Sequence, residues 1–466
     1  MMTDWSRFNP ATFDGVTEDE ARKVLPRTGT FIRDWMEYFY QISDAPMIYS
    51  LGGGLTMIAP LIPEKVKMPG PDRLRPNLFT LLIGPPSGAR KTFAVDHAEF
   101  HLTEAKAGMH ILSSIGSAEA IADEVIAFPN RLITASEGGN FLQHTIGGRY
   151  GGAVRWLLCD IYDSKKVSRV TIGAKTQNKI RKGDSNAGVP TQDNPRVSML
   201  MACTKAAIEG YTFKEDWAGG FLSRYIILWA QRERNFSEAR DAHEDYITPV
   251  RAKLAALKAV TACGECSGME PGAKAFFSAW QARLSAFAQT REETTSGIID
   301  RAQQNAKKTA MILAYDRHVF LGQHIEEPWA LDMEDVRIGC TLGEFSVKSA
   351  LHVEQDVTDN EHGQRMNRLV NLIRKSPHGA RTVPDLLRQM NRPQKMIQGD
   401  LDTLVAAERL IQSSGANVKG APVEVYAIPD SRWLGDAAVA LQSPGGYGST
   451  GLAPIPRNDD DSSTRH

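Results

Sequence analysis

The loop that follows the apolar run 78–83 constrains this chain more than any other feature of its sequence. Residues 81–92 read LLIGPPSGARKT: an apolar strand enters a turn rich in Gly, Pro and Ser, and a Lys-Thr pair opens a helix expected over 93–102. Backbone N–H groups at such a helix start point toward an anion, a lysine adds a mobile positive charge, and a threonine hydroxyl can bind Mg²⁺. The pattern predicts a phosphate-binding loop for ATP and Mg²⁺, with Lys91 on the phosphates and Thr92 on the metal.

This loop departs from the common pattern G-x-x-x-x-G-K-[ST] at two positions. With Lys91 as the reference, Pro85 and Arg90 replace the two glycines, and Gly84 lies one place early. A side chain at position 90 must tolerate a backbone shape that glycine usually provides. The alternative is a strand–turn–helix with an incidental Lys-Thr pair. The predicted nucleotide contacts in the loop are Gly84, Pro86, Ser87, Gly88, Ala89, Arg90, Lys91 and Thr92.

A second apolar run, 132–135, ends in Ser136 and Glu137. An acid at the tip of such a strand polarises the water that attacks the γ-phosphate, so Glu137 is the predicted catalytic carboxylate. Ser136 stands where a second acid usually helps to hold the metal, which predicts that Mg²⁺ is held there through water. The alternative for Glu137 is an ordinary exposed carboxylate at the end of a strand.

Three further residues follow in the order that an AAA+ ATPase needs. The apolar run 198–203 ends at Thr204, whose hydroxyl is suited to sensing the γ-phosphate. Arg224 stands at the entrance to another strand, in a segment that resembles the one from which an arginine finger reaches a neighbouring subunit's nucleotide. Arg301 resembles the second sensor arginine, which closes over bound ATP. The alternatives are a strand-edge arginine paired with a nearby carboxylate for Arg224 and a solvated helix arginine for Arg301.

Apolar periodicity divides the chain into an α/β protein with helical additions. Short apolar runs alternate with helical stretches in the core, as in an AAA+-like P-loop NTPase built on a parallel sheet; a sheet of the RecA type is the alternative. The predicted parts are a helical N-terminal region (1–70), the ATPase core (71–236), a helical lid (237–355), a winged-helix domain (363–430) and a disordered tail (436–466).

The net charge is −1, so nucleic-acid binding must come from local basic patches. Segment 164–183 holds seven Lys or Arg residues and no acid, and the alternative for it is a solvated basic loop. In the winged helix, the third helix would enter the DNA major groove, although many such modules only pack against neighbouring subunits. The predicted DNA contacts are Lys175, Lys179, Arg181 and Lys182 in the basic segment, and Arg392 and Lys395 at the start of that helix.

Other features predict a cytoplasmic protein. No apolar run approaches the roughly 18 residues of a membrane span, so no membrane association is expected. The N-terminus has neither a basic start nor an apolar stretch, which argues against secretion. Five scattered cysteines, an odd number, fit a reducing compartment better than a disulfide framework.

Over roughly residues 30–355 the chain resembles a family of helicase-like P-loop proteins carried by phages, plasmids and integrated elements. The resemblance rests on SGARKT (87–92), Ser-Glu (136–137), IYD (161–163) and GGFLSR (219–224). The Arg-Lys pair of the phosphate loop recurs in that family. The finger, the lid arginine and the C-terminal winged helix are also similar to minichromosome maintenance (MCM) helicases.

This resemblance implies a ring-forming ATPase, with a hexamer as the expected assembly, that translocates on single-stranded or forked DNA as a replicative helicase of a mobile element. In MCM-like ATPases a hairpin at the place of segment 164–183 projects into the central channel of the ring and grips DNA. Two other functions stay open. One is a DNA-binding initiator or helicase loader without unwinding activity, and the other is a structural oligomer that binds ATP without turnover.

Overall fold

The fold comes from a computed structural model of the chain, which forms two compact units, residues 1–357 and 358–466. It describes residues 3–70, 74–86, 88–105, 110–112, 117–146, 151–168, 190–212, 214–234, 244–291, 293–322, 326–355, 357, 361–376, 379–390, 393–416 and 422–429.

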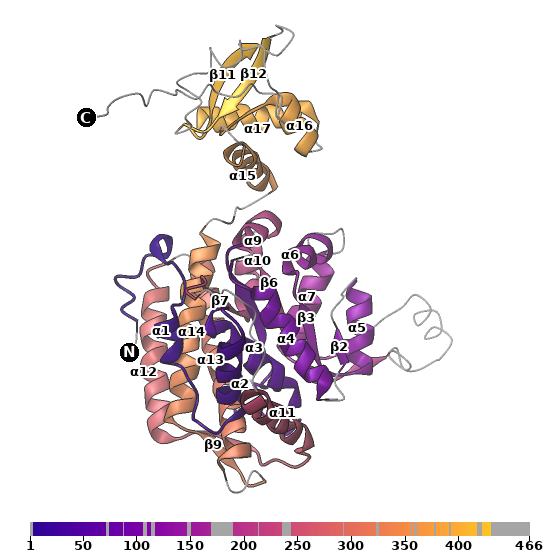
Figure 1. The fold of residues 1–466 in the computed structure, drawn as a ribbon, viewed down its shortest axis with the longest axis vertical. Helices are drawn as coiled ribbons and strands as arrows, with labels where there is room; N and C mark the ends of the chain where they lie inside the picture. The colour runs from indigo at the N-terminus through magenta and orange to yellow at the C-terminus, as the bar shows by residue number, and fades with distance from the viewer. Residues whose placement is uncertain are drawn as a thin grey trace, which may run out of the picture. The chain divides into compact units, whose positions relative to one another are not determined.

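A five-stranded parallel sheet forms the centre of the first unit (Figure 1). Its four longer strands are short apolar runs, buried along most of their length, as expected for parallel strands covered on both faces. The α/β class and the parallel sheet predicted from the sequence are therefore confirmed. In spatial order the strands are β2 (His110–Leu112), β3 (Asn130–Ala135), β6 (Arg196–Cys203), β1 (Phe79–Ile83) and β7 (Tyr225–Trp229).

The strand order creates a ligand-binding position beside β1. The connection that leaves β1 passes through α4 (Lys91–Glu104) to β2 at the far edge, whereas the connection that leaves the neighbouring β6 crosses to β7 on the other side of β1. Where the connections of adjacent parallel strands diverge in this way, a crevice opens outside their carboxyl ends. The loop at residues 84–90 lies at this crevice.

Helices cover both faces of the sheet and one of its edges. α3 (Met47–Ile58) and α4 pack on one face, and α7 (Gly151–Tyr162) packs on the other. α14 (Met333–Glu354) lies against the edge strand β7, where the Ser346 and Ser349 hydroxyls accept hydrogen bonds from Ile227 N at 2.9 Å and Trp229 N at 3.0 Å. These bonds satisfy two backbone N–H groups on the open edge of the sheet.

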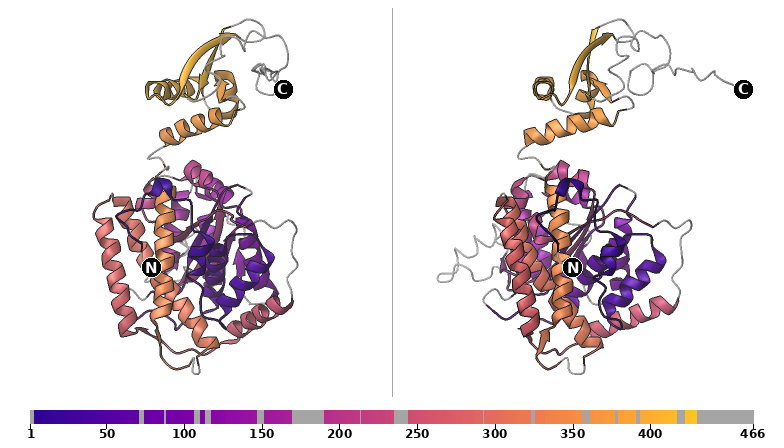
Figure 2. Two further views of the ribbon diagram at one scale, coloured as in Figure 1. Left: turned by 60° about the vertical axis from the view of Figure 1, so that its left-hand side comes forward. Right: turned by 90° about the vertical axis from the view of Figure 1, so that its left-hand side faces the viewer.

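The helical region that follows β7 packs into this same unit. Its longest helices, α12 (Pro271–Ala288), α13 (Glu293–Phe320) and α14, lie side by side next to the sheet (Figure 2). They are preceded by α11 (Glu244–Ala259), which packs on α2. No helix in the described part of the chain is both long and apolar enough to span a membrane.

The helical N-terminal region predicted from the sequence is present. It consists of α1 (Glu18–Arg22), α2 (Phe31–Ile42) and α3. The first turn of α2 is capped from another part of the chain, because the buried Asp316 carboxylate of α13 accepts hydrogen bonds from Phe31 N and Ile32 N, both at 2.9 Å. The region is thus built into the first unit.

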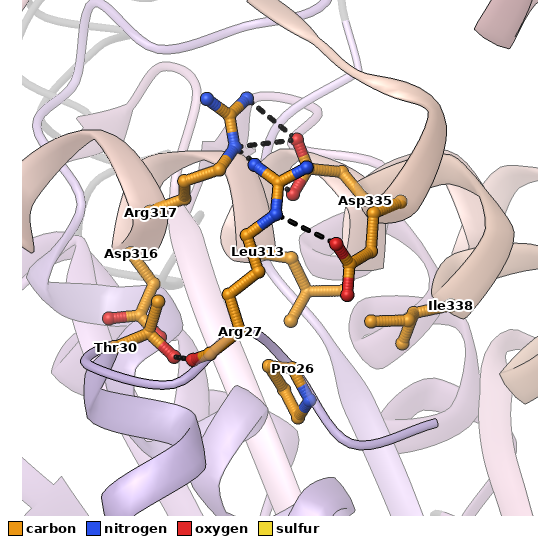
Figure 3. Close-up of a pocket in the computed structure, with 9 residues that line it drawn as sticks. Pro26, Arg27, Thr30, Leu313, Asp316, Arg317, Asp335 and Ile338 are labelled. Carbon is orange, nitrogen blue, oxygen red and sulfur yellow. Dashed lines mark hydrogen bonds and ion pairs between the residues drawn. The ribbon is translucent and has the colours of Figure 1, made fainter. Parts of the chain in front are cut away.

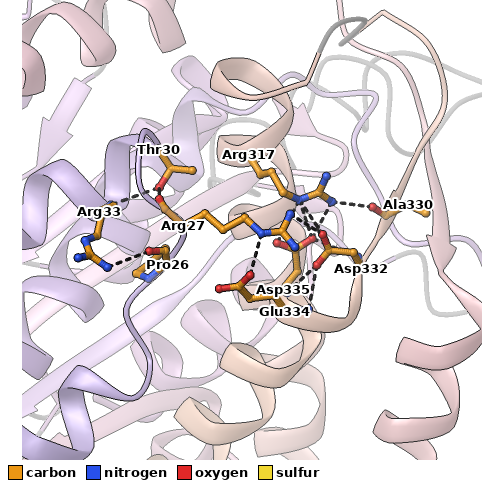
Figure 4. Close-up of polar contacts among 9 residues, drawn as sticks. All are labelled: Pro26, Arg27, Thr30, Arg33, Arg317, Ala330, Asp332, Glu334 and Asp335. Carbon is orange, nitrogen blue, oxygen red and sulfur yellow. Dashed lines mark hydrogen bonds and ion pairs between the residues drawn. The ribbon is translucent and has the colours of Figure 1, made fainter.

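A group of charged side chains, the N-terminal arginine cluster, strengthens this junction (Figures 3 and 4). Arg27 and Arg317 share Asp332, with N–O distances of 2.7 and 3.2 Å. Arg27 also pairs with Glu334 at 2.7 Å, and Arg317 pairs with Asp335 at 2.8 Å. The cavity beside these residues measures only about 10 Å³, so the side chains fill their own space.

The second unit is a small helical domain with a three-stranded antiparallel sheet of order β10-β12-β11. Apolar side chains of its three helices form a core, and Arg365 makes an ion pair with the buried Asp400. The succession of three helices and a final pair of strands agrees with the sequence prediction. The elements are α15 (Glu361–Arg374), β10 (Ala380–Thr382), α16 (Val383–Met390), α17 (Gln394–Ala406), β11 (Ile411–Ala416) and β12 (Pro422–Ala427).

Candidate functional site

The base of the predicted phosphate loop is held by close packing at Gly84. The Tyr49 hydroxyl donates to Ile83 O at 2.6 Å and lies 2.9 Å from Ala230 O. A Cβ atom on Gly84 would approach the Tyr49 hydroxyl to 2.6 Å and Ala230 O to 2.9 Å, closer than side chains tolerate. The glycine that lies one place early in the sequence pattern is therefore required by the packing under the loop.

Arg90 adopts the left-handed backbone shape that its position in the loop demands, with φ 48° and ψ 36°. This shape costs a non-glycine residue about 1–2 kcal/mol. Arg90 Nε lies 2.5 Å from the carboxylate of Asp44, which is 1% exposed and also pairs with Arg232 at 3.0 Å. Asp44 belongs to the N-terminal region, so a segment outside the motif helps to hold the arginine in place.

Lys91 is the first residue of α4, and its side chain is directed back over the loop. Its Nζ donates to Pro85 O at 2.8 Å, and the residue is buried. Burial lowers the pKa of Lys91, while nearby Cys203 and Glu137 oppose that shift. A phosphate oxygen could replace the Pro85 carbonyl as the acceptor and would favour the charged ammonium.

Thr92 reaches the end of β3, where Ser136 and Glu137 lie. Its hydroxyl donates to Ser136 O at 3.4 Å, and Glu137 is exposed. A Cβ atom on the following Gly138 would come 2.5 Å from Ala202 O, so the tip of β3 closely approaches the end of β6. The structure therefore brings together the predicted residues Lys91, Thr92, Ser136 and Glu137.

The donor set at this place fits Mg²⁺ bound mainly through phosphate and water. Within the described ranges, no group of three or more His, Cys, Asp or Glu side chains is placed to hold a metal ion. Mg²⁺ usually keeps several waters and takes one or two protein ligands beside substrate phosphates. The Thr92 hydroxyl and the Glu137 carboxylate are suitable partners of that kind.

Cys203 is the last residue of the neighbouring strand β6, and Thr204 follows it. The Thr204 hydroxyl caps α9 (Lys205–Tyr211) by accepting a hydrogen bond from Ala207 N at 3.2 Å, and a capping hydroxyl still has its own proton to donate. Cys203 is buried, and burial raises the pKa of its thiol to about 12. Sequence reasoning missed Cys203, since it reads only as the last residue of an apolar run.

Arg224 and Arg301 lie at the opposite end of the sheet. Arg224 directly precedes Tyr225, which pairs with Phe79 at the start of β1, whereas the phosphate loop follows the end of β1. Five residues of strand separate the two ends by about 16 Å. Arg301, predicted to close over bound ATP, lies beside Arg224 and away from the phosphate loop of its own chain.

The two arginines share one carboxylate. Arg224 Nη2 lies 2.7 Å from Asp163 Oδ2, and Arg301 Nη1 lies 3.0 Å from Asp163 Oδ1. Burial favours the neutral form of Asp163, but the hydrogen bond and charge of Arg224, together with the charge of Arg301, outweigh it and lower its pKa. The carboxylate partner that sequence reasoning kept as the alternative for Arg224 is thus Asp163.

A pocket of about 240 Å³, the amino-edge pocket, opens beside this pair. Lys308 lies in its wall, is buried, and donates to Asn77 Oδ1 at 3.1 Å and Tyr162 O at 3.2 Å. Burial lowers the pKa of Lys308 well below its ordinary value. Sequence reasoning missed Lys308. The residues that line the pocket are Leu74, Arg75, Tyr162, Asp163, Ser164, Lys165, Arg301, Gln304 and Lys308.

Two short strands lie on either side of residues 169–190, which include most of the basic segment. β4 (Val167–Ser168) and β5 (Thr191–Gln192) form an antiparallel pair. Of the other predicted contacts, Lys395 is exposed in the first turn of α17. Ser87, Arg392 and the four basic-segment residues Lys175, Lys179, Arg181 and Lys182 lie outside the described residues.

Comparison with protein-family models finds no match to this chain, and comparison with curated proteins finds no significant match.

Proposed function

We propose that the chain is an ATPase of the AAA+ type that binds ATP at the loop 84–92. One observation carries this proposal: Lys91 opens α4 at the carboxyl ends of the strands, and the Thr92 hydroxyl beside it contacts the backbone of Ser136, next to Glu137. A cation and a hydroxyl at the start of α4 and a carboxylate after the neighbouring strand β3 are the groups that phosphoryl transfer requires.

Each residue then has one role in hydrolysis. Lys91 exchanges Pro85 O for phosphate oxygens, and the N–H groups at the start of α4 face the same charge. Mg²⁺ would supply charge neutralisation, and the Thr92 hydroxyl would hold it directly, with Ser136 and Glu137 placed to hold its waters. Glu137 accepts the proton of the attacking water. Thr204 donates its hydroxyl proton to the terminal phosphate.

The positions of Arg224 and Arg301 support a ring as the working assembly, with a hexamer as the expected state. Neither arginine lies at the phosphate loop of its own chain, so a contact with nucleotide requires a second copy. The helices α11 to α14, which follow the core in the order of an AAA+ lid, favour this fold over the RecA type. The element order of the second unit is that of a winged helix.

We further propose that this ring translocates on DNA. The antiparallel pair of β4 and β5 flanks residues 169–190, the part of the chain that contains Lys175, Lys179, Arg181 and Lys182, which is what a hairpin projecting into a central channel would need. Replacing Lys179, Arg181 and Lys182 together with Ala should weaken single-stranded DNA binding, flatten its salt dependence and remove DNA-stimulated hydrolysis. Unchanged stimulation would leave the second unit, with Arg392 and Lys395, as the DNA contact.

The ATPase proposal is tested by Lys91→Ala and Glu137→Gln. The first variant should lose nucleotide binding, and the second should bind ATP without turnover because an amide cannot accept the proton of water. Nucleotide affinity and phosphate release measure the two effects. Lys274→Ala and Glu265→Gln, at exposed positions outside the site, are the matched controls. Normal hydrolysis by Glu137→Gln would place the catalytic acid elsewhere.

Strand displacement on a forked duplex separates the remaining alternatives. A helicase unwinds the fork with ATP, an initiator or loader hydrolyses ATP without unwinding, and a structural oligomer binds ATP without releasing phosphate. We favour the helicase because the chain combines the nucleotide residues with four predicted basic DNA contacts that lie in sequence between the paired strands β4 and β5.

A further inference from the structure

Arg224 and Arg301 differ in their access to the amino-edge pocket. Arg301 lies in the pocket wall, whereas Arg224 is not among the described lining residues. The Arg224 side chain is 8% exposed, and its Nη1 donates to Gly220 O at 2.6 Å while Nη2 binds Asp163. Its Nε is buried and has no hydrogen-bond partner among the residues that the structure describes. Arg224 is therefore held behind Asp163.

Arg301 has donor groups to spare. In the described residues, its hydrogen bonds to Asp163 at 3.0 Å and to Gln304 at 2.8 Å all come from Nη1. A guanidinium carries five N–H donors in a planar fork, so those on Nε and Nη2 remain for an oxyanion. The side chain is 24% exposed, three times the exposure of Arg224.

The pocket has the charge and the room for an anion. Among the described residues that line it, Arg75, Lys165 and Arg301 carry positive charge and Asp163 is the acid, while Lys165 also pairs with Asp160 at 3.0 Å and the buried Lys308 adds an N–H donor. A volume of about 240 Å³ exceeds several times the roughly 30 Å³ share of one water molecule in the liquid. A phosphate group fits both conditions, because its oxygens accept from several cationic donors at once.

We propose that the amino-edge pocket receives a phosphate group of the nucleotide bound to a second copy of this chain, that Arg301 is the arginine that contacts it, and that Arg224 is a positioning residue that acts through Asp163. This inference rests on the proposed function and assigns a different role in it to each of the two arginines. Gly220 O fixes Arg224, Arg224 fixes one oxygen of Asp163, and the other oxygen orients Nη1 of Arg301.

Chemical rescue separates a contact from a positioning residue. Arg301→Ala and Arg224→Ala should both lower ATP turnover, Arg301→Ala by at least 100-fold, since arginines of this kind contribute about 10³–10⁵ to kcat. Guanidinium ion at about 10 mM, well below denaturing concentrations, should restore turnover at least tenfold in Arg301→Ala, because the vacated space opens to the pocket. It should not restore Arg224→Ala.

Lysine replacements give the second readout, and thermal unfolding of each variant shows whether it folds. Arg224→Lys should keep turnover within about tenfold of the wild type, since an ammonium can still hold Asp163. Arg301→Lys should remain as impaired as Arg301→Ala, because the planar fork is lost. Rescue of Arg224→Ala by guanidinium, or rescue of neither alanine variant, would overturn the assignment.

Assemblies that contain two different variants test whether the pocket acts on the nucleotide of a second copy. Arg301→Ala mixed with Lys91→Ala should recover activity, because each supplies the part that the other lacks at some interfaces. No recovery in assemblies shown to be mixed would exclude the pocket as a site served between copies. These outcomes differ from a failure of the proposed function: absence of turnover in the wild type would defeat both, whereas full turnover in Arg301→Ala would defeat this inference alone.

Discussion

Two clusters in the first unit are built alike and differ in what surrounds them. In the N-terminal arginine cluster, Arg27 and Arg317 share Asp332; at the amino edge of the sheet, Arg224 and Arg301 share Asp163. The first faces a cavity of about 10 Å³ and the second a pocket of about 240 Å³. The same pairing therefore occurs once in a filled junction and once beside open space.

The two clusters also differ in their balance of acidic and basic side chains. Around Asp332, the acids Glu334 and Asp335 bring three carboxylates to two arginines. Around Asp163, the arginines are joined in the pocket wall by Arg75 and by Lys165, which also pairs with Asp160 at 3.0 Å. A filled cluster in which acids outnumber arginines holds the fold together, whereas a surplus of positive charge beside an open pocket favours an anionic ligand.

The largest expected effect comes from replacing each shared aspartate with asparagine. Asp163→Asn removes the charge that orients Arg301, so we expect turnover to fall on the order of 100-fold. Asp332→Asn, the matched change in the filled cluster, should leave kcat within about twofold. Steady-state hydrolysis at saturating ATP measures both. Equal losses in the two variants would mean that both act through folding.

Asp332→Asn should instead lower stability. Asparagine remains a good N-cap for α14, where the Asp332 side chain accepts from the N–H groups of Glu334 and Asp335, so the change isolates the ionic part of the interaction. Losing a charged partner for two arginines should cost about 1.5–3 kcal/mol. Urea unfolding measures the shift in midpoint. Arg388→Ala, which removes an exposed ion pair of the second unit, is the control and should cost less than about 1 kcal/mol.

Sequence patterns located elements best where burial is continuous or periodic. The run 78–83 matches β1 to within one residue, and the helix expected over 93–102 lies within α4. β2 has three residues, and β4 and β5 have two each, so none of them could produce a detectable pattern. Such short strands are defined only by the partners that they meet in the folded chain.

The residues of the candidate site also fall into two groups, those that sequence patterns could locate and those that they could not. Lys91, Thr92, Ser136 and Glu137 were predictable because each follows a strand and the carboxyl ends of parallel strands meet at one edge of the sheet. Asp44, Lys308 and the link of Asp163 to both arginines were not, since they join segments far apart in the chain. Single-sequence reasoning has no signal for such pairings.

Two buried acids that line the filled cavity, Asp316 and Asp335, should titrate in the opposite sense to Asp163 of the open pocket. Burial raises the pKa of Asp316 to about 7 and that of Asp335 to about 6, whereas the pKa of Asp163 lies below its ordinary value. A raised pKa in the folded state means that the stabilisation by the protonated acid is complete below about pH 4 and is lost as pH rises through 7.

Asp316→Asn tests the direction of this pH dependence. It should lower the free energy of unfolding less than Asp332→Asn does, because the amide keeps one acceptor for the first turn of α2. Between pH 5 and pH 8 the urea midpoint of the wild type should fall relative to that of the variant. Asp163→Asn should show the reverse below pH 4, where the wild type loses the stabilisation that its ionised carboxylate supplies. A midpoint difference that does not change with pH would mean that Asp316 stays ionised throughout.

The smallest effect is expected at a third shared aspartate, Asp44, which pairs with Arg90 and Arg232 beside the phosphate loop. Arg90→Gly loses an ion pair whose arginine is 50% exposed, worth less than about 1 kcal/mol, but it relieves the left-handed backbone strain of about 1–2 kcal/mol. Glycine also makes the unfolded chain more flexible, which costs about 0.5–1 kcal/mol, so the net change in unfolding free energy should stay within about 1 kcal/mol. Arg90→Ala loses the same pair and keeps the strain, and should therefore be the less stable of the two. If alanine proved as stable as glycine, the loop would not need a left-handed residue before Lys91, and Asp44 would have no strain to offset.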